Sequence, residues 1–218
     1  MKVGTDSVLL GSWFPLGGDE LRIADLGTGT GILALIMAQR SKADVVAFES
    51  DPEAGMQASE NFSASPWPER ISCVTGDIRD TAPAHFDVCI FNPPYFNRKL
   101  NAPDPLRNQA RHMLGQSPYD WMQACDRLLH EKGRVGLIIP TEEEKTWLQA
   151  ANNSGFFPQL RVMVKGKPGK EVKRILYVLS RLPAMPETEQ LTIETEVRGK
   201  FTEAFAALVY DIYPDTNR

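Results

Sequence analysis

The residues at positions 92–95, Asn-Pro-Pro-Tyr, are of types that can hold a planar amino group. They follow directly after an apolar run. Because proline cannot donate to a strand ladder and biases the preceding residue towards extended geometry, we expect a strand to end at Phe91. The Asn92 side-chain carbonyl and the Pro93 backbone carbonyl can accept both hydrogens of one –NH2 group. Tyr95 offers a flat face to the ring that carries this group. A plain Pro-Pro turn or a polyproline recognition segment is the alternative interpretation.

A second stretch, residues 25–31 (Asp-Leu-Gly-Thr-Gly-Thr-Gly), is typical of a turn that binds a nucleotide or a related cofactor. Three glycines stand at alternate positions in it: Gly27, Gly29 and Gly31. They let the backbone approach a ligand closely and turn into a helix, expected over residues 32–39, whose first N–H groups are free. With Ala34 in the last position the stretch also fits the dinucleotide fingerprint. Asp25 favours the sulfonium and amino-acid moiety of S-adenosylmethionine, since a carboxylate would repel a pyrophosphate.

Two further acids stand at expected strand ends. Glu49 is the last residue of the run 44–49. Sites for S-adenosylmethionine and sites for dinucleotides both have a carboxylate at this position that binds the ribose hydroxyls. Asp77 follows the run 71–75, and its carboxylate could accept a hydrogen bond from an adenine amino group, with Ile78 packing against the ring. An Asx turn ahead of the next helix explains Asp77 equally well.

The elements that position these residues alternate between helix and strand patterns. Helices are expected over residues 5–14, 32–39, 52–64, 119–130, 142–154 and 201–209. Strands are expected over residues 21–24, 44–49, 71–75, 86–91, 133–140, 159–164 and 174–180. The pattern predicts one α/β domain over residues 1–218 with a mostly parallel sheet, and the last two strands form a hairpin that places an antiparallel strand at one edge. Ligands of such sheets bind at the carboxyl ends of the strands.

Two segments are rich in basic residues. The first, residues 96–117, is long, polar and without a helix or strand pattern, so we expect a mobile basic lip over the substrate. The second is the hairpin loop, residues 165–171, which is either a solvated guard of the sheet edge or a contact for nucleic-acid phosphates. The basic residues of the two segments and the adjoining strand are Arg98, Lys99, Arg107, Arg111, Lys165, Lys167, Lys170, Lys173 and Arg174.

Composition sets limits on the kind of protein. A chain of 218 residues with 42% hydrophobic and 24% charged residues predicts a soluble globular domain, with no membrane span and no signal peptide at the start. The net charge of −4 argues against a protein that is basic overall. Three cysteines in largely apolar surroundings predict buried thiols in the cytoplasm, and the three histidines show no metal-ligand spacing, so no metal site is expected. These residues are Cys73, Cys89, Cys125, His85, His112 and His130.

The four motifs, in this order and at strand ends, resemble those of the class I S-adenosylmethionine-dependent methyltransferases that modify exocyclic amines. The similarity covers residues 20–180. It implies a Rossmann-like, doubly wound and mostly parallel sheet of seven strands with an antiparallel hairpin at the edge. It also implies S-adenosylmethionine as cofactor and S-adenosylhomocysteine as product.

The flanking sequence is similar to the bacterial tRNA (valine-1) adenine-N6 methyltransferases, through residues 1–13, 109–111 and 201–205 and the aromatic residue after Tyr95. Members of that family usually carry further residues ahead of the stretch that begins here at Met1. The resemblance implies an N-terminal cofactor lid over residues 1–20, with Thr5 and Asp6 near the amino-acid end of the cofactor.

Residues and resemblance together predict the whole site. The cofactor is expected to contact Thr5, Asp6, Asp25, Gly27, Gly29, Gly31, Glu49, Asp77, Ile78 and Asn92. Catalysis is expected from Asn92, Pro93, Pro94 and Tyr95, and substrate binding from Tyr95, Phe96, Arg98, Arg111, Lys165 and Lys167.

The expected reaction is direct methyl transfer to the N6 amine of an adenine that is already unstacked, as in the anticodon loop of a valine tRNA. The protein is expected to be a monomer that binds tRNA and neither membrane nor metal. The Asn-Pro-Pro-Tyr turn also occurs in release-factor glutamine methyltransferases, although their N-terminal helical domain has no counterpart in this sequence. A module that binds cofactor or RNA without turnover is the remaining alternative.

Overall fold

The structure, a computed structural model, describes residues 5–94 and 115–213. Its centre is an eight-stranded sheet with the strand order β3-β2-β1-β4-β5-β7-β6-β8. The strands are β1 (Arg22–Leu26), β2 (Asp44–Glu49), β3 (Ile71–Thr75), β4 (Phe86–Phe91), β5 (Leu129–Pro140), β6 (Phe157–Lys165), β7 (Val172–Ser180) and β8 (Glu187–Thr192). Strands β1 to β5 are mutually parallel, and β7 is antiparallel to both of its neighbours. The doubly wound α/β class predicted from the sequence is confirmed.

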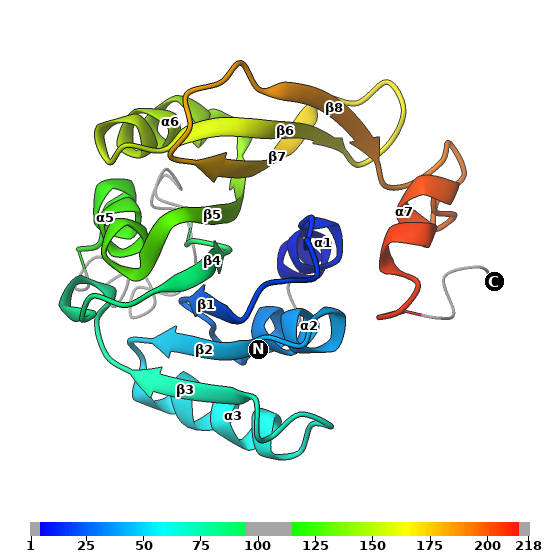
Figure 1. Ribbon diagram of the computed structural model, residues 1–218. Coiled ribbons are helices and arrows are strands. Elements are labelled where there is room, and N and C mark those ends of the chain that lie inside the picture. The colour runs from blue at the N-terminus through cyan, green and yellow to red at the C-terminus, as the bar shows by residue number, and fades with distance from the viewer. Residues whose placement is uncertain (1–4, 95–114, 214–218) are drawn as a thin grey trace.

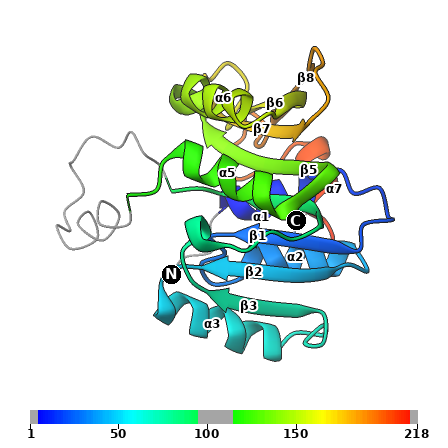
Figure 2. The same cartoon turned by 60° about the vertical axis from the view of Figure 1, so that its left-hand side comes forward.

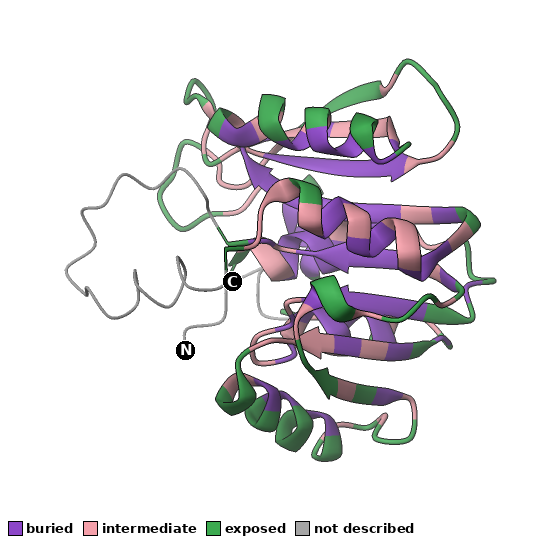
Figure 3. Cartoon of the chain, turned by 90° about the vertical axis from the view of Figure 1, so that its left-hand side faces the viewer, coloured by how far each residue is buried: buried purple, intermediate pink, exposed green. Residues whose placement is uncertain are grey.

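Helices cover both faces of this sheet (Figure 1). They are α1 (Thr5–Trp13), α2 (Ile32–Arg40), α3 (Pro52–Ser63), α5 (Pro118–Leu128), α6 (Glu144–Asn153) and α7 (Glu203–Val209), with short 3-10 turns η1 (Ile78–Asp80) and η2 (Thr141–Glu143). One core cluster joins the sheet to α1, α2, α3 and α7, and the other joins it to α5 and α6. In Figure 3 the buried residues accordingly lie on the strands and on the inner faces of the helices. The central strands read as continuous apolar runs because both of their faces are covered.

The strand count predicted from the sequence is one too low. Strand β8 pairs in parallel with β6 and forms the edge of the sheet, so the hairpin of β6 and β7 lies inside the edge. Its sequence, Glu-Thr-Glu-Gln-Leu-Thr, contains one apolar residue, and none of its residues is buried. Only Leu191 of this strand packs against the core, so the strand has no hydrophobic period to detect. Its polar side chains suit an edge exposed to other chains.

The boundary between α5 and β5 also differs from the prediction. A helix was expected to reach His130, but α5 ends at Leu128 and β5 begins at Leu129. The first residues of β5 are extended because they contact β4: Leu129 pairs with Phe86, and His130 Nε2 lies 3.0 Å from Asp87 Oδ1. These are tertiary contacts, and a local helix pattern does not reveal them.

The C-terminal helix is shorter than expected. Thr202 caps α7 by accepting a hydrogen bond from the Phe205 N–H, so Phe201 precedes the helix and instead forms an isolated bridge with Glu194. Among the helices of the described ranges, none combines the length and the apolar character that crossing a membrane requires.

The register of the sheet gathers the sequence motifs at one edge. Asp25 in β1 is paired with Ala47 in β2 and with Ile90 in β4, so the segments that follow these three strands leave the sheet together. Figure 2 shows β1, β2 and β3 side by side. The antiparallel β7 begins at the same edge, because Arg174 is paired with Pro140 at the carboxyl end of β5.

Candidate active site

The glycine-rich turn between β1 and α2 has three glycines with three different surroundings. All three have a positive backbone φ angle, which residues other than glycine rarely adopt. A Cβ on Gly27 would lie 2.6 Å from the Trp121 ring, and one on Gly31 would lie 2.4 Å from the Phe62 ring. A Cβ on Gly29 would meet no atom within 4 Å. Two of the glycines therefore fix the turn against the core, and Gly29 is the one whose backbone faces open space.

Asp25 lies beneath this turn and is buried. Its Oδ2 atom accepts hydrogen bonds from Thr28 Oγ1 at 2.5 Å and from the Ala34 N–H at 3.1 Å. Its Oδ1 atom is also buried but has no hydrogen-bond partner among the residues that the structure describes. Burial raises the pKa of Asp25 to about 7, and the charge of Glu49 adds to the rise against the effect of the two hydrogen bonds. A buried carboxylate oxygen without a donor marks a place where a cationic or N–H-bearing ligand would fit.

Glu49 stands at the end of β2 and is half-buried. Its Oε2 atom accepts from the Gly29 N–H at 2.8 Å, and its Oε1 atom accepts from the Asp51 N–H at 2.9 Å. The carboxylate is thereby held beside the open glycine. Oε1 also accepts from the Ser50 hydroxyl at 3.4 Å, whereas Oε2 has a further lone pair that can accept a hydrogen bond from a ligand hydroxyl.

Asp77 forms the Asx turn that the sequence offered as one of two interpretations. It caps η1 by accepting from the Arg79 N–H at 2.8 Å, and it binds the Arg79 guanidinium through both carboxylate oxygens. Hydrogen bonding to Arg79 lowers the pKa of Asp77. The Gln116 amide also donates to Asp77 Oδ1 at 3.1 Å, so an –NH2 group already occupies the acceptor proposed for adenine. The side chain of Ile78 is buried beside it in the α5 core.

The Asn92 turn follows the end of β4 at Phe91, as the two prolines predict. Asn92 is half-buried, Pro93 is buried and Pro94 is exposed. The Asn92 Nδ2 atom donates to Ser7 Oγ in α1 at 3.0 Å. Among the described residues, Asn92 Oδ1 accepts no hydrogen bond.

Helix α1 brings the predicted lid residues to this edge. Thr5 is exposed at its first position, and Asp6 Oδ2 accepts from Arg174 Nε in β7 at 2.8 Å. Sequence reasoning assigned Asp6 to the cofactor and Arg174 to nucleic acid. The ion pair between them, joining residues far apart in the chain, has no sequence signal.

The basic hairpin loop lies at the same edge as Asn92, beyond β5 and β7. Lys167 of the loop is paired with Glu194 at 3.2 Å, and Lys173, at the start of β7, is paired with Glu171 at 3.3 Å. Lys165 and Lys170 make no ion pair with any described residue, and both line an open cleft of about 550 Å³. Its lining also includes Lys173.

Several predicted residues lie outside the described ranges: Tyr95, Phe96, Arg98, Lys99, Arg107 and Arg111. Most of the expected substrate loop, residues 96–117, lies outside them too. Within the described ranges, no group of three or more His, Cys, Asp or Glu side chains is arranged to hold a metal ion. The three cysteines are free thiols, and of these Cys89 and Cys125 are buried.

The arrangement fits a ligand with a cationic amino-acid end and a ribose. The unpartnered Asp25 oxygen suits the cationic end, the open backbone at Gly29 allows close approach, and Glu49 offers acceptors for hydroxyl groups. A pyrophosphate would meet two carboxylates here, which favours S-adenosylmethionine over a dinucleotide.

Comparison with known proteins identifies relatives over nearly the whole chain. A family model described as the methyltransferase small domain matches residues 2–119. A tRNA1(Val) (adenine(37)-N6)-methyltransferase from Tolumonas auensis is 42% identical over 98% of this chain and 90% of its own length. A protein of the same name from Bacteroides fragilis is 36% identical over 98% of this chain and 91% of its own length.

Solved structures show the same fold at lower identity. The crystal structure of a predicted O-methyltransferase from Agrobacterium tumefaciens matches 94% of this chain and 95% of its own, with a TM-score of 0.75 and 22% identity. A ribosomal protein L11 methylase from Lactobacillus delbrueckii matches 80% of this chain and 77% of its own, with a TM-score of 0.58 and 21% identity.

Proposed function

The chain belongs to the family of tRNA1(Val) (adenine(37)-N6)-methyltransferases, and we propose that it transfers a methyl group from S-adenosylmethionine to the N6 amine of an adenine in tRNA. The proposed adenine is the one at position 37 of valine tRNA, in the anticodon loop. The observation that carries the proposal is Asn92. Its amide stands at the carboxyl end of β4 with the nitrogen held by Ser7, beside the edge where Asp25 and Glu49 offer acceptors.

The cofactor is held by groups at the ends of β1, β2 and β3. Asp25 serves the cationic amino-acid end, with helix α1 (Thr5 and Asp6) as the lid above it. Glu49 accepts from the ribose hydroxyls while its bond to the Gly29 N–H keeps the turn in place. When bound, S-adenosylmethionine supplies an electrophilic methyl group on a sulfonium whose positive charge is lost in the transfer. Because of that loss, the chain needs no strong general base before the new bond forms.

Further cofactor contacts come from neighbouring residues. Gly27 and Gly31 shape the turn, and Ile78 packs against the adenine of the cofactor. Asp77 accepts from the amino group of that adenine in place of the Gln116 amide. The exchange replaces one –NH2 donor with another, so the hydrogen bonding of Asp77 is conserved.

The substrate adenine is oriented by the turn after β4. An exocyclic amine is a poor nucleophile because its lone pair is delocalised into the ring. Asn92 Oδ1 and the Pro93 carbonyl accept its two N–H bonds, which turns the lone pair towards the methyl group, and we propose that Tyr95 stacks on the base. The proton that leaves the amine after transfer passes to solvent.

The tRNA backbone is held at the same sheet edge. We infer contacts to phosphates from Lys165 and Lys170, whose ammonium groups have no acidic partner among the described residues. Lys167, paired with Glu194, contributes only if it exchanges that partner. We propose that Phe96, Arg98 and Arg111 of the loop 96–117 also contact the tRNA. The protein acts in the cytoplasm as a monomeric single-domain enzyme.

The test is to supply purified protein and labelled S-adenosylmethionine with unmodified tRNA in one tube and release factors in another. Nucleosides from the digested tRNA are then separated and identified by mass. Label in N6-methyladenosine at the anticodon-loop position is the expected result. Label only in release-factor protein, or in neither substrate, would overturn the proposal.

A further inference from the structure

Trp121, in α5, contacts both of the turns that the proposed site uses. The residue is only 2% exposed. Its ring packs against Phe91, the residue directly before Asn92, with the ring centroids 5.2 Å apart. Its outer edge reaches the glycine-rich turn. The three atoms nearest to a Cβ built on Gly27 all belong to the Trp121 ring, and Cη2 would be 2.6 Å away. One buried side chain therefore connects the turn after β1 with the turn after β4.

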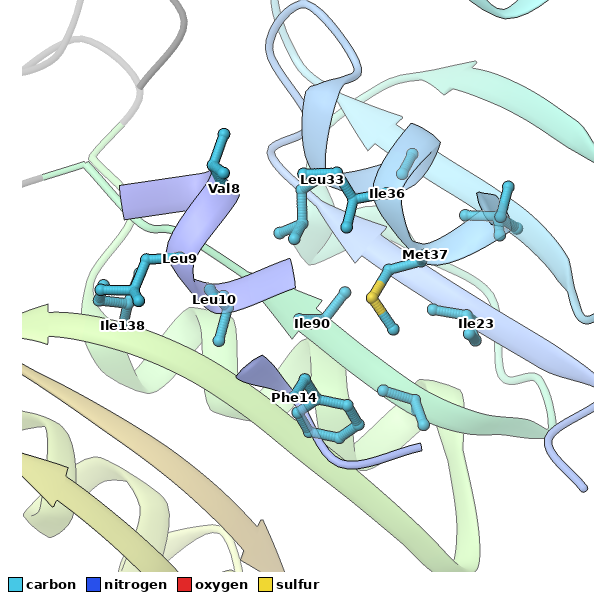
Figure 4. Close-up of a cluster of buried hydrophobic side chains, with 14 of the residues drawn as sticks. Val8, Leu9, Leu10, Phe14, Ile23, Leu33, Ile36, Met37, Ile90 and Ile138 are labelled. Atoms are coloured by element: carbon cyan, nitrogen blue, oxygen red, sulfur yellow. The ribbon is translucent and has the colours of Figure 1, made fainter. Parts of the chain in front are cut away.

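The two strands that lead into these turns are fixed from the opposite face of the sheet. Ile23 of β1 and Ile90 of β4 point into the core cluster that α1 and α2 help to form, as Figure 4 shows. Because successive side chains of a strand point to opposite faces, Phe91 points towards the face that α5 covers.

The pairing between these two strands ends before either turn. The last residues of β1 and β4 that pair with each other are Asp25 and Ile90. Gly27 and Asn92 lie beyond this pair, and the Gly27 N–H donates to Phe48 of β2 instead. The separation of the two turns is therefore set by side-chain packing, and Trp121 is the residue that packs on both.

Helix α5 determines where the indole lies. Its inner face is buried in the core, through residues that include Cys125 and Leu128. Near its end, Arg127 Nη2 donates to the carbonyl oxygen of Ile78 at 2.8 Å. Trp121 Nε1 has no hydrogen-bond partner among the described residues, so packing holds the ring in place. A phenylalanine at this position would thus lose no described hydrogen bond.

We propose that Trp121 is a positioning residue for methyl transfer, whose ring sets the separation between the Gly27 turn at the methyl donor and the Asn92 turn at the substrate amine. The inference rests on the proposed function, because it requires the donor at one turn and the amine at the other. The buried side chain acts through the two turns and does not touch the reacting atoms. Its effect on the rate is large because a misplacement of about 1 Å between reacting groups can lower a rate about a hundredfold.

The test compares Trp121→Phe, which removes the atoms that reach Gly27, with Trp147→Phe. Trp147 of α6 is also buried, and its ring lies 5.7 Å from Phe91 at the same interplanar angle of 40°. Trp121→Phe should lower the single-turnover rate of tRNA methylation by about ten- to a hundredfold. The Kd of S-adenosylmethionine and the KM for tRNA should change by less than about threefold, because each ligand moves with its own turn.

Trp147→Phe should lose a similar amount of thermal stability but change the rate by less than about threefold. Equal losses of rate in the two variants, or a rise in the Kd of S-adenosylmethionine that matches the loss of rate, would overturn the positioning role. Phe91→Leu perturbs the same packing from the other turn, and it should lower the rate with the Kd unchanged. A Phe91→Leu rate equal to that of the parent would also overturn the role.

A double-mutant cycle tests the contact with Gly27 directly. In the parent the methyl group of Gly27→Ala clashes with the indole, whereas in the Trp121→Phe background it enters the space that the indole has left. The strain of the positive φ is common to both backgrounds and cancels. Gly27→Ala should therefore lower the rate at least about tenfold in the parent and less than about threefold in Trp121→Phe.

Equal effects of Gly27→Ala in the two backgrounds would show that the residues act independently, which would overturn the inference alone. A parent protein that leaves tRNA unmethylated would reject the proposed function, and the inference with it.

Discussion

Asp25→Asn should stabilise the ligand-free protein at alkaline pH and weaken cofactor binding at the same time. Asp25 has a folded pKa of about 7 against an ordinary value of 3.8, because burial disfavours the charged form. A carboxyl group with a raised folded pKa contributes stability at low pH and loses it as the pH rises towards the folded pKa. The free energy of unfolding of the ligand-free protein should therefore contain a term that falls between pH 4 and pH 7.

The size of this term follows from the distance between the two pKa values. Each pH unit in the window changes the free energy of unfolding by about 1.4 kcal/mol, so the term falls by about 3 kcal/mol between pH 5 and pH 8. The asparagine amide can keep the bonds to Thr28 and Ala34 through its oxygen, and it has no charge to bury. Its –NH2 group replaces an oxygen that has no hydrogen-bond partner among the described residues. The variant and the parent should thus be about equally stable at pH 5, with the variant ahead by about 3 kcal/mol at pH 8.

Urea unfolding at several pH values measures this difference, and groups common to both proteins cancel. Asp87→Asn is the matched control, since backbone and His130 hydrogen bonds outweigh the effect of burial and lower the pKa of Asp87. That substitution should destabilise the protein at pH 8. Calorimetry should show the S-adenosylmethionine Kd of Asp25→Asn raised by about tenfold or more, the value of a charge-assisted hydrogen bond. Parallel stability curves for Asp25→Asn and the parent across this pH range would refute the reasoning.

Gly31→Ala should lower the free energy of unfolding by about 2–5 kcal/mol, because the added methyl group clashes with the buried Phe62 ring and the backbone is left-handed. Gly169 also has positive φ, but no described atom lies within 4 Å of an added Cβ. Gly169→Ala should therefore lower the free energy of unfolding by only about 1–2 kcal/mol. Equal losses in thermal unfolding of the two variants would contradict the packing assigned to Gly31. Lys165→Ala with Lys170→Ala should flatten the log–log dependence of tRNA Kd on salt by about 1.4–1.8. The control is Lys42→Ala with Lys132→Ala, at the opposite sheet edge, which should leave this salt dependence unchanged. If both double variants showed the same slope, Lys165 and Lys170 would be solvated surface residues that do not contact tRNA.

Much of the fold could be predicted from the sequence because its signals are local. Apolar runs bounded by glycine, proline or an acid mark β1 to β4 closely, as at Phe91, where two prolines end the strand. What failed depended on partners elsewhere in the chain. Strand β8 has a single apolar residue, Leu191, and the start of β5 at Leu129 is set by pairing with Phe86. Neither feature is marked in the sequence by a hydrophobic periodicity or by a glycine or proline that ends an element.

In the candidate site, too, some features could be predicted from local sequence and others depend on distant partners. Residues fixed by strand ends, such as Asp25 and Glu49, arrive at a common edge because the strand register requires it. The partners of these side chains were not predictable. Arg174 binds Asp6, and Ser7 binds Asn92 across 85 positions of sequence. A serine directly after two predicted lid residues was the only available hint.

The central claim is that Asn92 acts on the substrate amine while the acids at the ends of β1 and β2 hold the methyl donor. Asn92→Ala tests it most directly when single-turnover methylation of unmodified tRNA and calorimetric S-adenosylmethionine binding are measured on the same preparation, with Glu49→Ala beside it. The account predicts a rate lower by two or more orders of magnitude for Asn92→Ala with an unchanged Kd, and a raised Kd for Glu49→Ala. A Kd that collapses together with the rate in Asn92→Ala, or a rate that does not fall, would contradict it.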